Sequence, residues 1–335
     1  MYLDISQDSF DLPLSTGPGV DKELGQRLEA VLFPDRATVF AILDGGRVPG
    51  LPEKLVAQGV LHVCLFSGDM AEDAGEAAPW LAQMQPDTPL LRQMFCDVPD
   101  DAAGVHGLMR AGAGIVIRSG LDMDTLRRHL RRFLRVEDST GRTYFFRFWE
   151  PDAAAVYFRA IAPRADVAHR WMYPRDAAPL EAIVIPTWLD GVGLTQVCPG
   201  PVPDQTPELR GAFALAAEET DALRDLQWRR DKAQLAERLA RTFPDAVDAL
   251  ADELPAVVSA MVDRMVGLGF WRRDMLFTFC AWAVHYGPDV LDSDPDGLIA
   301  AALARPDPVE DRFADVSARM KVLERDYLAR EATLG

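Results

Sequence analysis

The segment from Asp122 to Asp152 reads DMDTLRRHLRRFLRVEDSTGRTYFFRFWEPD and predicts a short helix that runs directly into a β-hairpin. At 100° per residue, one arc of the helix is apolar and consists of Leu126, Leu130, Phe133 and Leu134. The opposite arc is basic without interruption and consists of Arg127, Arg128, Arg131, Arg132 and Arg135. Asp122 stands at the expected N-cap. The pattern predicts a helix that buries one arc and presents the other.

The hairpin is predicted from two extended runs, 136–137 and 143–149, joined by a turn over 138–141 that ends in glycine. Alternation along the second run places Tyr144, Phe146 and Phe148 on one face. The other face carries Phe145, Arg147 and Trp149, and Pro151 ends the pairing. In this register Arg147 and Trp149 would lie near the arginine helix, with aromatic side chains exposed beside the guanidinium groups.

The basic arc belongs to an acidic chain. The 335 residues carry a formal net charge of −17 at pH 7, which disfavours nucleic acid and anionic membranes as general partners. Like charges four residues apart on a helix repel by about 0.2–0.5 kcal/mol per pair. Two interpretations stay open: the arginines form a solvated face or pair with internal carboxylates, or they recognise an anionic surface on a partner.

The cysteines, the first residues and the hydrophobic runs indicate the cellular compartment of the protein. Four cysteines are scattered singly through apolar segments without paired spacing, as expected in a reducing compartment. The first ten residues lack the basic start and apolar run of a signal peptide. The longest apolar run, 275–284, is too short to span a bilayer. These features predict a soluble, cytoplasmic protein that does not contact membranes.

Before residue 198 the sequence alternates between strand and helix signals. Strands are predicted over 38–43, 60–66, 114–118, 180–186 and 193–197. Helices are predicted over 22–31, 51–58, 90–95, 152–160 and 165–171, and a loop with a helix over 71–84. The order predicts an α/β (α+β) lobe with a mixed β-sheet over residues 1–198.

A proline-rich segment follows this lobe. Residues 199–207 hold four prolines, which neither a helix nor a central strand tolerates, and they predict a linker. From 208 to 335 the periodicity is helical, with segments predicted over 208–219, 221–242, 245–253, 255–267, 274–286, 295–304 and 308–331. The second lobe is therefore expected to be all-α.

Motifs for catalysis or cofactor binding are missing from the linear sequence. Gly45 and Gly46 follow a strand without a dinucleotide or phosphate-loop pattern and indicate a plain turn. His62 and Cys64 share one face of a predicted strand, but two ligands do not make a metal site. We therefore expect no catalytic residue, no cofactor and no metal, and a protein that is not an enzyme.

Three segments resemble one family. They are Phe40–Arg47, Ala78–Leu81, and Leu126–Val136 leading to Phe145–Pro151. The chain resembles, over about residues 37–160, the domain-of-unknown-function family of type VI secretion effector chaperones, also called adaptors. Glu150 and Trp149 replace the aspartate and the smaller aromatic that are usual there, and both keep the chemical type. The helical region resembles the C-terminal lobe of such adaptors through Phe243-Pro244 and residues 285–287.

The resemblance implies a non-catalytic bacterial adaptor that binds a toxin effector and loads it onto the spike protein of the secretion apparatus. Combined with the arginine helix, it gives a predicted partner-binding set of Arg128, Arg131, Arg132, Arg135, Arg147, Trp149, Asp44 and Arg47. Arginine and tryptophan are frequent hot-spot residues in protein interfaces. Two alternatives stay open: an enzyme or anion-binding protein that uses the arginines as a phosphate or carboxylate site, and a nucleic-acid-binding helix.

Overall fold

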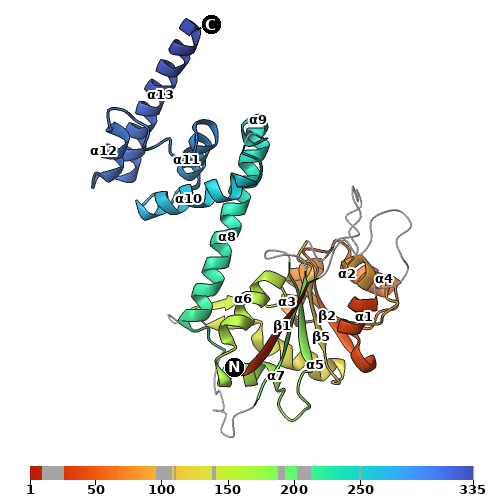
Figure 1. Cartoon of the computed structure of the whole chain (residues 1–335). Helices are drawn as coiled ribbons and strands as arrows, with labels where there is room; N and C mark the ends of the chain where they lie inside the picture. Colours follow the sequence, from red (N-terminus) through yellow and green to blue (C-terminus); the bar gives the residue numbers. More distant parts are fainter. Residues whose placement is uncertain are drawn as a thin grey trace. The chain divides into compact units, whose positions relative to one another are not determined.

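The computed structural model describes residues 1–9, 26–95, 108, 111–137, 141–187, 193–201, 213–248 and 250–334. The chain divides into two compact units, Met1–Leu226 and Gln227–Gly335. The first combines a sheet with helices, and the secondary structure described in the second consists of helices (Figure 1). The predicted fold class, an α/β lobe followed by an all-α lobe, is confirmed.

A seven-stranded sheet with the order β1-β9-β8-β5-β2-β4-β3 forms the centre of the first unit. Its strands are β1 (Leu3–Ser9), β2 (Val39–Asp44), β3 (His62–Cys64), β4 (Pro79–Met84), β5 (Gly114–Arg118), β8 (Ala182–Thr187) and β9 (Gly193–Pro199). All neighbouring pairs are antiparallel, so the prediction of a mixed sheet is wrong in this respect. Continuous apolar runs indicate burial on both faces, and they do not determine strand direction.

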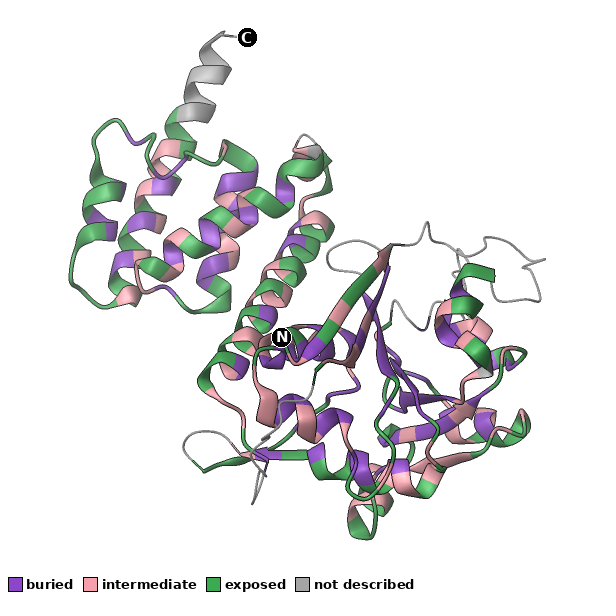
Figure 2. Ribbon diagram, turned by 60° about the horizontal axis from the view of Figure 1, so that its bottom comes forward, coloured by how far each residue is buried: buried purple, intermediate pink, exposed green. Residues whose placement is uncertain are grey.

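Helices cover both faces of this sheet (Figure 1). Along β2, Phe40 and Ile42 join one core cluster, whereas Val39, Ala41 and Leu43 join the other. The first cluster holds α5 (Met123–Leu130), the 3-10 turn η3 (Arg131–Phe133), α6 (Pro151–Ile161) and α7 (Ala165–Met172). The second holds α1 (Gln26–Leu32), α2 (Leu51–Ala57) and α4 (Pro89–Phe95). Figure 2 shows that the central strands are buried, as β2, β5 and β8 are throughout, and that the helices expose their outer faces.

The prediction of a loop and a helix over 71–84 is wrong for residues 79–84. Only α3 (Asp69–Ala74) and the short turn η2 (Gly75–Ala77) are helical there. The segment 79–84 is β4, which pairs with β2 on one side and with β3 on the other. Its alanine, glutamine and methionine favour helices, but hydrogen bonding on both edges outweighs that weak preference. The N-terminal strand β1 was also not predicted.

The predicted hairpin forms, with a shorter second strand. Strand β6 (Arg135–Glu137) pairs with β7 (Thr143–Phe145) in the register Arg135↔Phe145. The chain then leaves the ladder, and the N–H of Glu150 donates to the Arg147 carbonyl in a turn at 2.9 Å. The prediction of a strand as far as Trp149 is therefore wrong. A continued strand would have placed Trp149 on the face opposite to Phe146 and Phe148, whereas the side chains of all three are buried.

The predicted linker coincides largely with residues that the structure does not describe. Pro199 belongs to β9, and 202–207 lie outside the described residues, so the linker stays a prediction. When the described chain resumes, Glu137 exchanges backbone hydrogen bonds with Phe213 and Leu215 at 2.8 and 2.9 Å. Buried Glu219, in the first turn of α8 (Ala217–Thr242), pairs with Arg164. These contacts place the start of α8 in the first unit.

The second unit comprises the remainder of α8 and the helices that follow it. They are α9 (Pro244–Asp248), the 3-10 turn η4 (Ala251–Glu253), α10 (Leu254–Gly267), α11 (Arg273–Tyr286), α12 (Leu298–Ala304) and α13 (Val309–Leu334). Each lies close to a predicted segment. Their apolar sides meet in one core that includes Leu239, Val258, Phe279, Leu291 and Val316.

Candidate functional site

The helix α5 and the turn η3 have the two faces that the sequence predicts. Leu126, Leu130, Phe133 and Leu134 are buried in the core of the first unit, and Phe133 stacks on Trp171 with a centroid separation of 3.6 Å. The Asp122 side chain accepts a hydrogen bond from the N–H of Thr125 at 2.9 Å. This bond lowers the pKa of Asp122 and confirms it as the N-cap.

The arginines divide into one that is structural and four that face outward. Arg127 donates to the carbonyls of Cys64 and Phe66 at 2.8 and 3.0 Å, so it joins the helix to the end of β3. The side chains of Arg128, Arg131, Arg132 and Arg135 are exposed. Arg128 donates to Thr125 at 3.1 Å, and Arg131 to Ser67. In the described part of the chain, none of the four forms an ion pair with a carboxylate.

Alternation placed Phe145 and Trp149 on one face of the hairpin near the arginine helix, and of these two Phe145 lies beside the guanidinium groups whereas Trp149 is buried. The guanidinium of Arg135 lies 5.6 Å from the centroid of the Phe145 ring, within the range of a cation–π contact. Phe145 is 53% exposed and contacts Phe66 at 5.8 Å between ring centroids. We call Arg128, Arg131, Arg132, Arg135 and Phe145 the arginine surface.

Asp44, Arg147 and Trp149 have a different role from the one predicted. Asp44 and Trp149 are each only 3% exposed, so Trp149 cannot present its ring to a partner in this conformation. The Asp44 carboxylate accepts hydrogen bonds from Arg147, from the indole N–H of Trp149 at 3.1 Å, and from the N–H of Gly46 at 2.9 Å. Arg147 remains half exposed. Asp44 therefore fixes the segment after the hairpin to the end of β2.

The turn after β2 depends on a close backbone approach. A Cβ atom at Gly45 would lie 1.8 Å from the carbonyl oxygen of Glu76, so only glycine fits at this position. Arg47 is exposed in the same turn and its N–H donates to the Asp44 carbonyl at 2.9 Å. Among the residues described, the Arg47 side chain makes no hydrogen bond or ion pair with the arginine surface. The predicted set therefore separates into an exposed surface, a buried carboxylate with its two donors, and Arg47.

The predicted partner-binding set omitted Phe145, Phe66 and Ser67, which the structure places beside the arginines. The signal for Phe145 was present, because alternation placed it opposite Phe146 and Phe148, which are buried. The signal for Phe66 and Ser67 was absent, since both lie more than fifty positions before the helix and reach it only through the fold.

Metal ligands and cavities do not add a second function to this surface. In the described ranges, no group of three or more His, Cys, Asp or Glu residues could hold a metal ion. The cavities bordered by Gln58, by Trp228 and by Asp263 have none of the four arginines in their walls. Across the same ranges, no helix combines the length and the apolar character that crossing a bilayer requires.

A comparison with protein families identifies the region around this surface. Residues 39–166 match the family described as Domain of unknown function (DUF4123). The chain carries a DUF4123 domain. The match runs from β2 to the start of α7, and it includes the arginine surface, Asp44 and Trp149. Neither the curated proteins nor the solved structures that were compared with the chain gave a match.

One histidine lies buried in the DUF4123 domain on the inner side of the arginine surface. His129 donates through Nε2 to the Trp171 carbonyl at 2.7 Å, and its ring packs edge-on against Phe133. Burial lowers the pKa of His129 to about 4. The hydrogen bond to the Trp171 carbonyl opposes this shift, and the nearby Arg132 guanidinium adds a smaller lowering effect. The buried ring is therefore neutral near pH 7 and is unsuited to act on a substrate in solution.

This buried histidine predicts a pH dependence of stability. Between pH 6.5 and 4 the unfolded chain binds a proton at position 129 that the folded chain excludes, so the free energy of unfolding should fall as the pH falls. The loss should total on the order of 3 kcal/mol by pH 4. Urea unfolding across this range should show a shallower decline for His129→Gln than for the wild type. His285→Gln, at an exposed ring, is the control, and equal declines for all three proteins would contradict the prediction.

Proposed function

We propose that this protein is a non-catalytic adaptor that binds a toxin effector and loads it onto the spike protein of a bacterial type VI secretion system. The DUF4123 domain and the sequence resemblance to effector chaperones support this role. The arginine surface is the part of the domain that would contact the effector.

The observation that carries the proposal is the state of the four arginines. They are exposed, and among the described residues they have no carboxylate partner. Internal pairing, which was the main alternative explanation for so many guanidinium groups on one helix, therefore lacks support in that part of the chain. An acidic or polar patch on a partner would relieve the like-charge repulsion between them and give each guanidinium directional hydrogen bonds.

Phe145 gives this surface an apolar contact beside the charges. Its ring is half exposed at the end of β7 while its other side meets Phe66, so it is held in place before any partner binds. Preorganised aromatic and arginine side chains are typical of residues that dominate binding energy in interfaces. The combination favours a protein surface over a free phosphate, which would use the charges alone.

The alternative of an enzyme or an anion-binding protein predicts a concave site with a titratable group close to the arginines. The candidate group is His129, and its imidazole is 4% exposed and hydrogen-bonded to the Trp171 carbonyl. The nucleic-acid alternative predicts a basic domain, whereas this chain has a net charge of −17. Both observations favour the adaptor proposal.

Co-purification tests the adaptor role. The full chain should be expressed with an effector and a spike protein encoded beside its gene, and the mixture resolved by size-exclusion chromatography. We expect a complex of all three proteins, and loss of effector from the spike fraction when the adaptor is omitted. An effector that reaches the spike equally well without this chain, or a gene located among metabolic enzymes, would contradict the proposal.

A further inference from the structure

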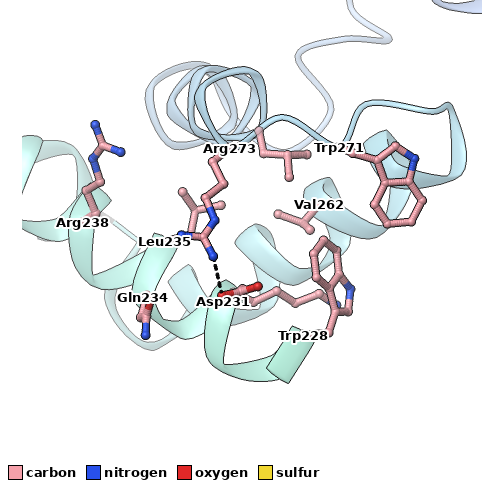
Figure 3. Close-up of a pocket in the computed structure, with 10 residues that line it drawn as sticks. Trp228, Asp231, Gln234, Leu235, Arg238, Val262, Trp271 and Arg273 are labelled. Carbon is pink, nitrogen blue, oxygen red and sulfur yellow. Dashed lines mark hydrogen bonds and ion pairs between the residues drawn. The ribbon is translucent and has the colours of Figure 1, made fainter. Parts of the chain in front are cut away.

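The second unit has a groove with an exposed tryptophan at one end (Figure 3). Trp271 is 66% exposed and lies 6.1 Å from Trp228 between ring centroids. Side chains of the core, Val262, Leu235 and Leu276, form the apolar part of the groove. An indole exposed to this extent leaves a large apolar area in water, which partner binding would remove.

The size of the groove indicates what could occupy it. Its volume is about 220 Å³, which is below the range of roughly 300–1,000 Å³ that is usual for sites binding drug-sized molecules. It is open to solvent and bordered by α8, α10 and α11. A space of this size accommodates one or two side chains of a peptide, with the remainder of the peptide lying across the rim.

Three cations, Lys232, Arg238 and Arg273, and one carboxylate, Asp231, line the groove. Lys232 is neutralised by Asp263 at 2.6 Å. Arg238 lies over the Phe277 ring at 4.4 Å and has no carboxylate partner among the residues described. Arg273 pairs with Asp231 at 3.1 Å, as Figure 3 shows, although its side chain is 80% exposed. An exposed pair of this kind contributes about 0–1 kcal/mol, so an incoming carboxylate can replace Asp231 as the partner of Arg273.

Two local features make this exchange favourable. Asp231 also accepts a hydrogen bond from Gln227 at 3.2 Å, so it keeps a partner after Arg273 has turned toward a ligand. The Arg273 side chain is 80% exposed, so its guanidinium can turn from Asp231 toward a carboxylate of a ligand.

We infer that the groove between Trp228 and Trp271 is a docking site for an acidic peptide segment of a partner protein. One aliphatic or aromatic side chain of the segment inserts beside the two indoles, and flanking carboxylates pair with Arg273 and Arg238. The inference uses residues of the second unit alone, so it does not rest on the function proposed for the arginine surface. If that function is also correct, the groove gives the protein a second, independent contact.

Peptide selection followed by binding measurements tests the inference. A library of random short peptides is displayed on phage and selected on the immobilised full chain, and enriched peptides are synthesised with a fluorescent label. We expect sequences with two or more acidic residues around an apolar one. In fluorescence anisotropy, Trp271→Ala and Arg273→Glu should each weaken binding at least about tenfold, and added salt should weaken it further.

Matched controls separate binding from folding. Leu298→Ala and Lys321→Glu remove an exposed apolar group and an exposed charge elsewhere on the same unit, and both should bind as the wild type does. The groove variants should keep the wild-type melting temperature, and Arg238→Glu replaces Arg273→Glu if the latter does not. Enrichment of neutral or basic peptides, binding that is indifferent to Trp271, or Trp271-dependent binding of a labelled oligo-dT strand would each overturn the inference.

Discussion

The double variant Arg128→Glu with Arg132→Glu is expected to lose effector capture while its DUF4123 domain stays folded. Each reversal replaces a guanidinium that can donate to an acidic surface with a carboxylate that repels it. Truncating a single charged hot spot costs about 2 kcal/mol or more, and two reversals that also add repulsion should cost considerably more. The amount of effector retained in a pull-down should therefore fall to background.

The fold should tolerate this change because both side chains are exposed and oppose the buried arc of α5 and η3. Exposed substitutions away from caps and ion pairs usually change stability by about 0.5 kcal/mol or less. Removing like charges also relieves the repulsion along the helix. The melting temperature of the double variant should accordingly remain close to that of the wild type.

A control with the same change in charge makes the result specific. Arg241→Glu with Lys321→Glu alters two exposed cations of the second unit and lowers the net charge equally. It should capture effector as the wild type does. Normal capture by a normally folded Arg128/Arg132 variant would contradict the arginine surface as the interface. A large drop in melting temperature would instead indicate that these arginines stabilise the fold.

Asp44→Ala is expected to lower the free energy of unfolding of the DUF4123 domain substantially. The substitution leaves the buried indole N–H of Trp149 without an acceptor and removes the partner of Arg147. An unsatisfied buried donor costs about 1–3 kcal/mol. Half-exposed Arg147 can turn to water. The loss of its carboxylate partner therefore destabilises the domain by less than the roughly 3–5 kcal/mol seen for fully buried pairs. A total of about 2–4 kcal/mol follows from these two contributions.

Calorimetry should show this loss as a melting temperature lower by about 4–16 °C, since each kcal/mol shifts the midpoint of a unit of this size by about 2–4 °C. Asp73→Ala, at an exposed acid of α3, is the control and should leave the midpoint nearly unchanged. Trp149→Phe removes the N–H donor and also shrinks a buried side chain, so it should lower the midpoint as well. Equal midpoints for Asp44→Ala and the wild type would show that this carboxylate does not fix the hairpin exit.

The helix at the centre of the predicted site could be derived from sequence because its pattern is local. The apolar arc, the N-cap and the outward guanidinium groups all follow from residue spacing along one helix. Strands buried on both faces could be located for the same reason, as β2 and β5 demonstrate. Their direction could not, since it depends on connections that residue spacing does not encode.

The role of Trp149 could not be derived because it depends on a distant residue. Alternation predicted an exposed ring, and that prediction assumed that the strand continued to Pro151. The strand ends at Phe145 because Asp44, more than a hundred positions earlier, binds Arg147 and Trp149 and holds the chain in a turn. A buried carboxylate with donors from remote segments is a tertiary feature, and it overrides local propensity.

Photo-crosslinking from Phe145 tests the central claim most directly. Benzoylphenylalanine replaces this residue with a similar aromatic group that reacts with whatever lies against it, and the same probe at Val56, which is 68% exposed on α2, provides the comparison. Because α2 packs on the opposite face of the sheet from α5, the account predicts that illumination links the effector to position 145 and not to position 56. A crosslink at position 56 with none at position 145 would contradict it.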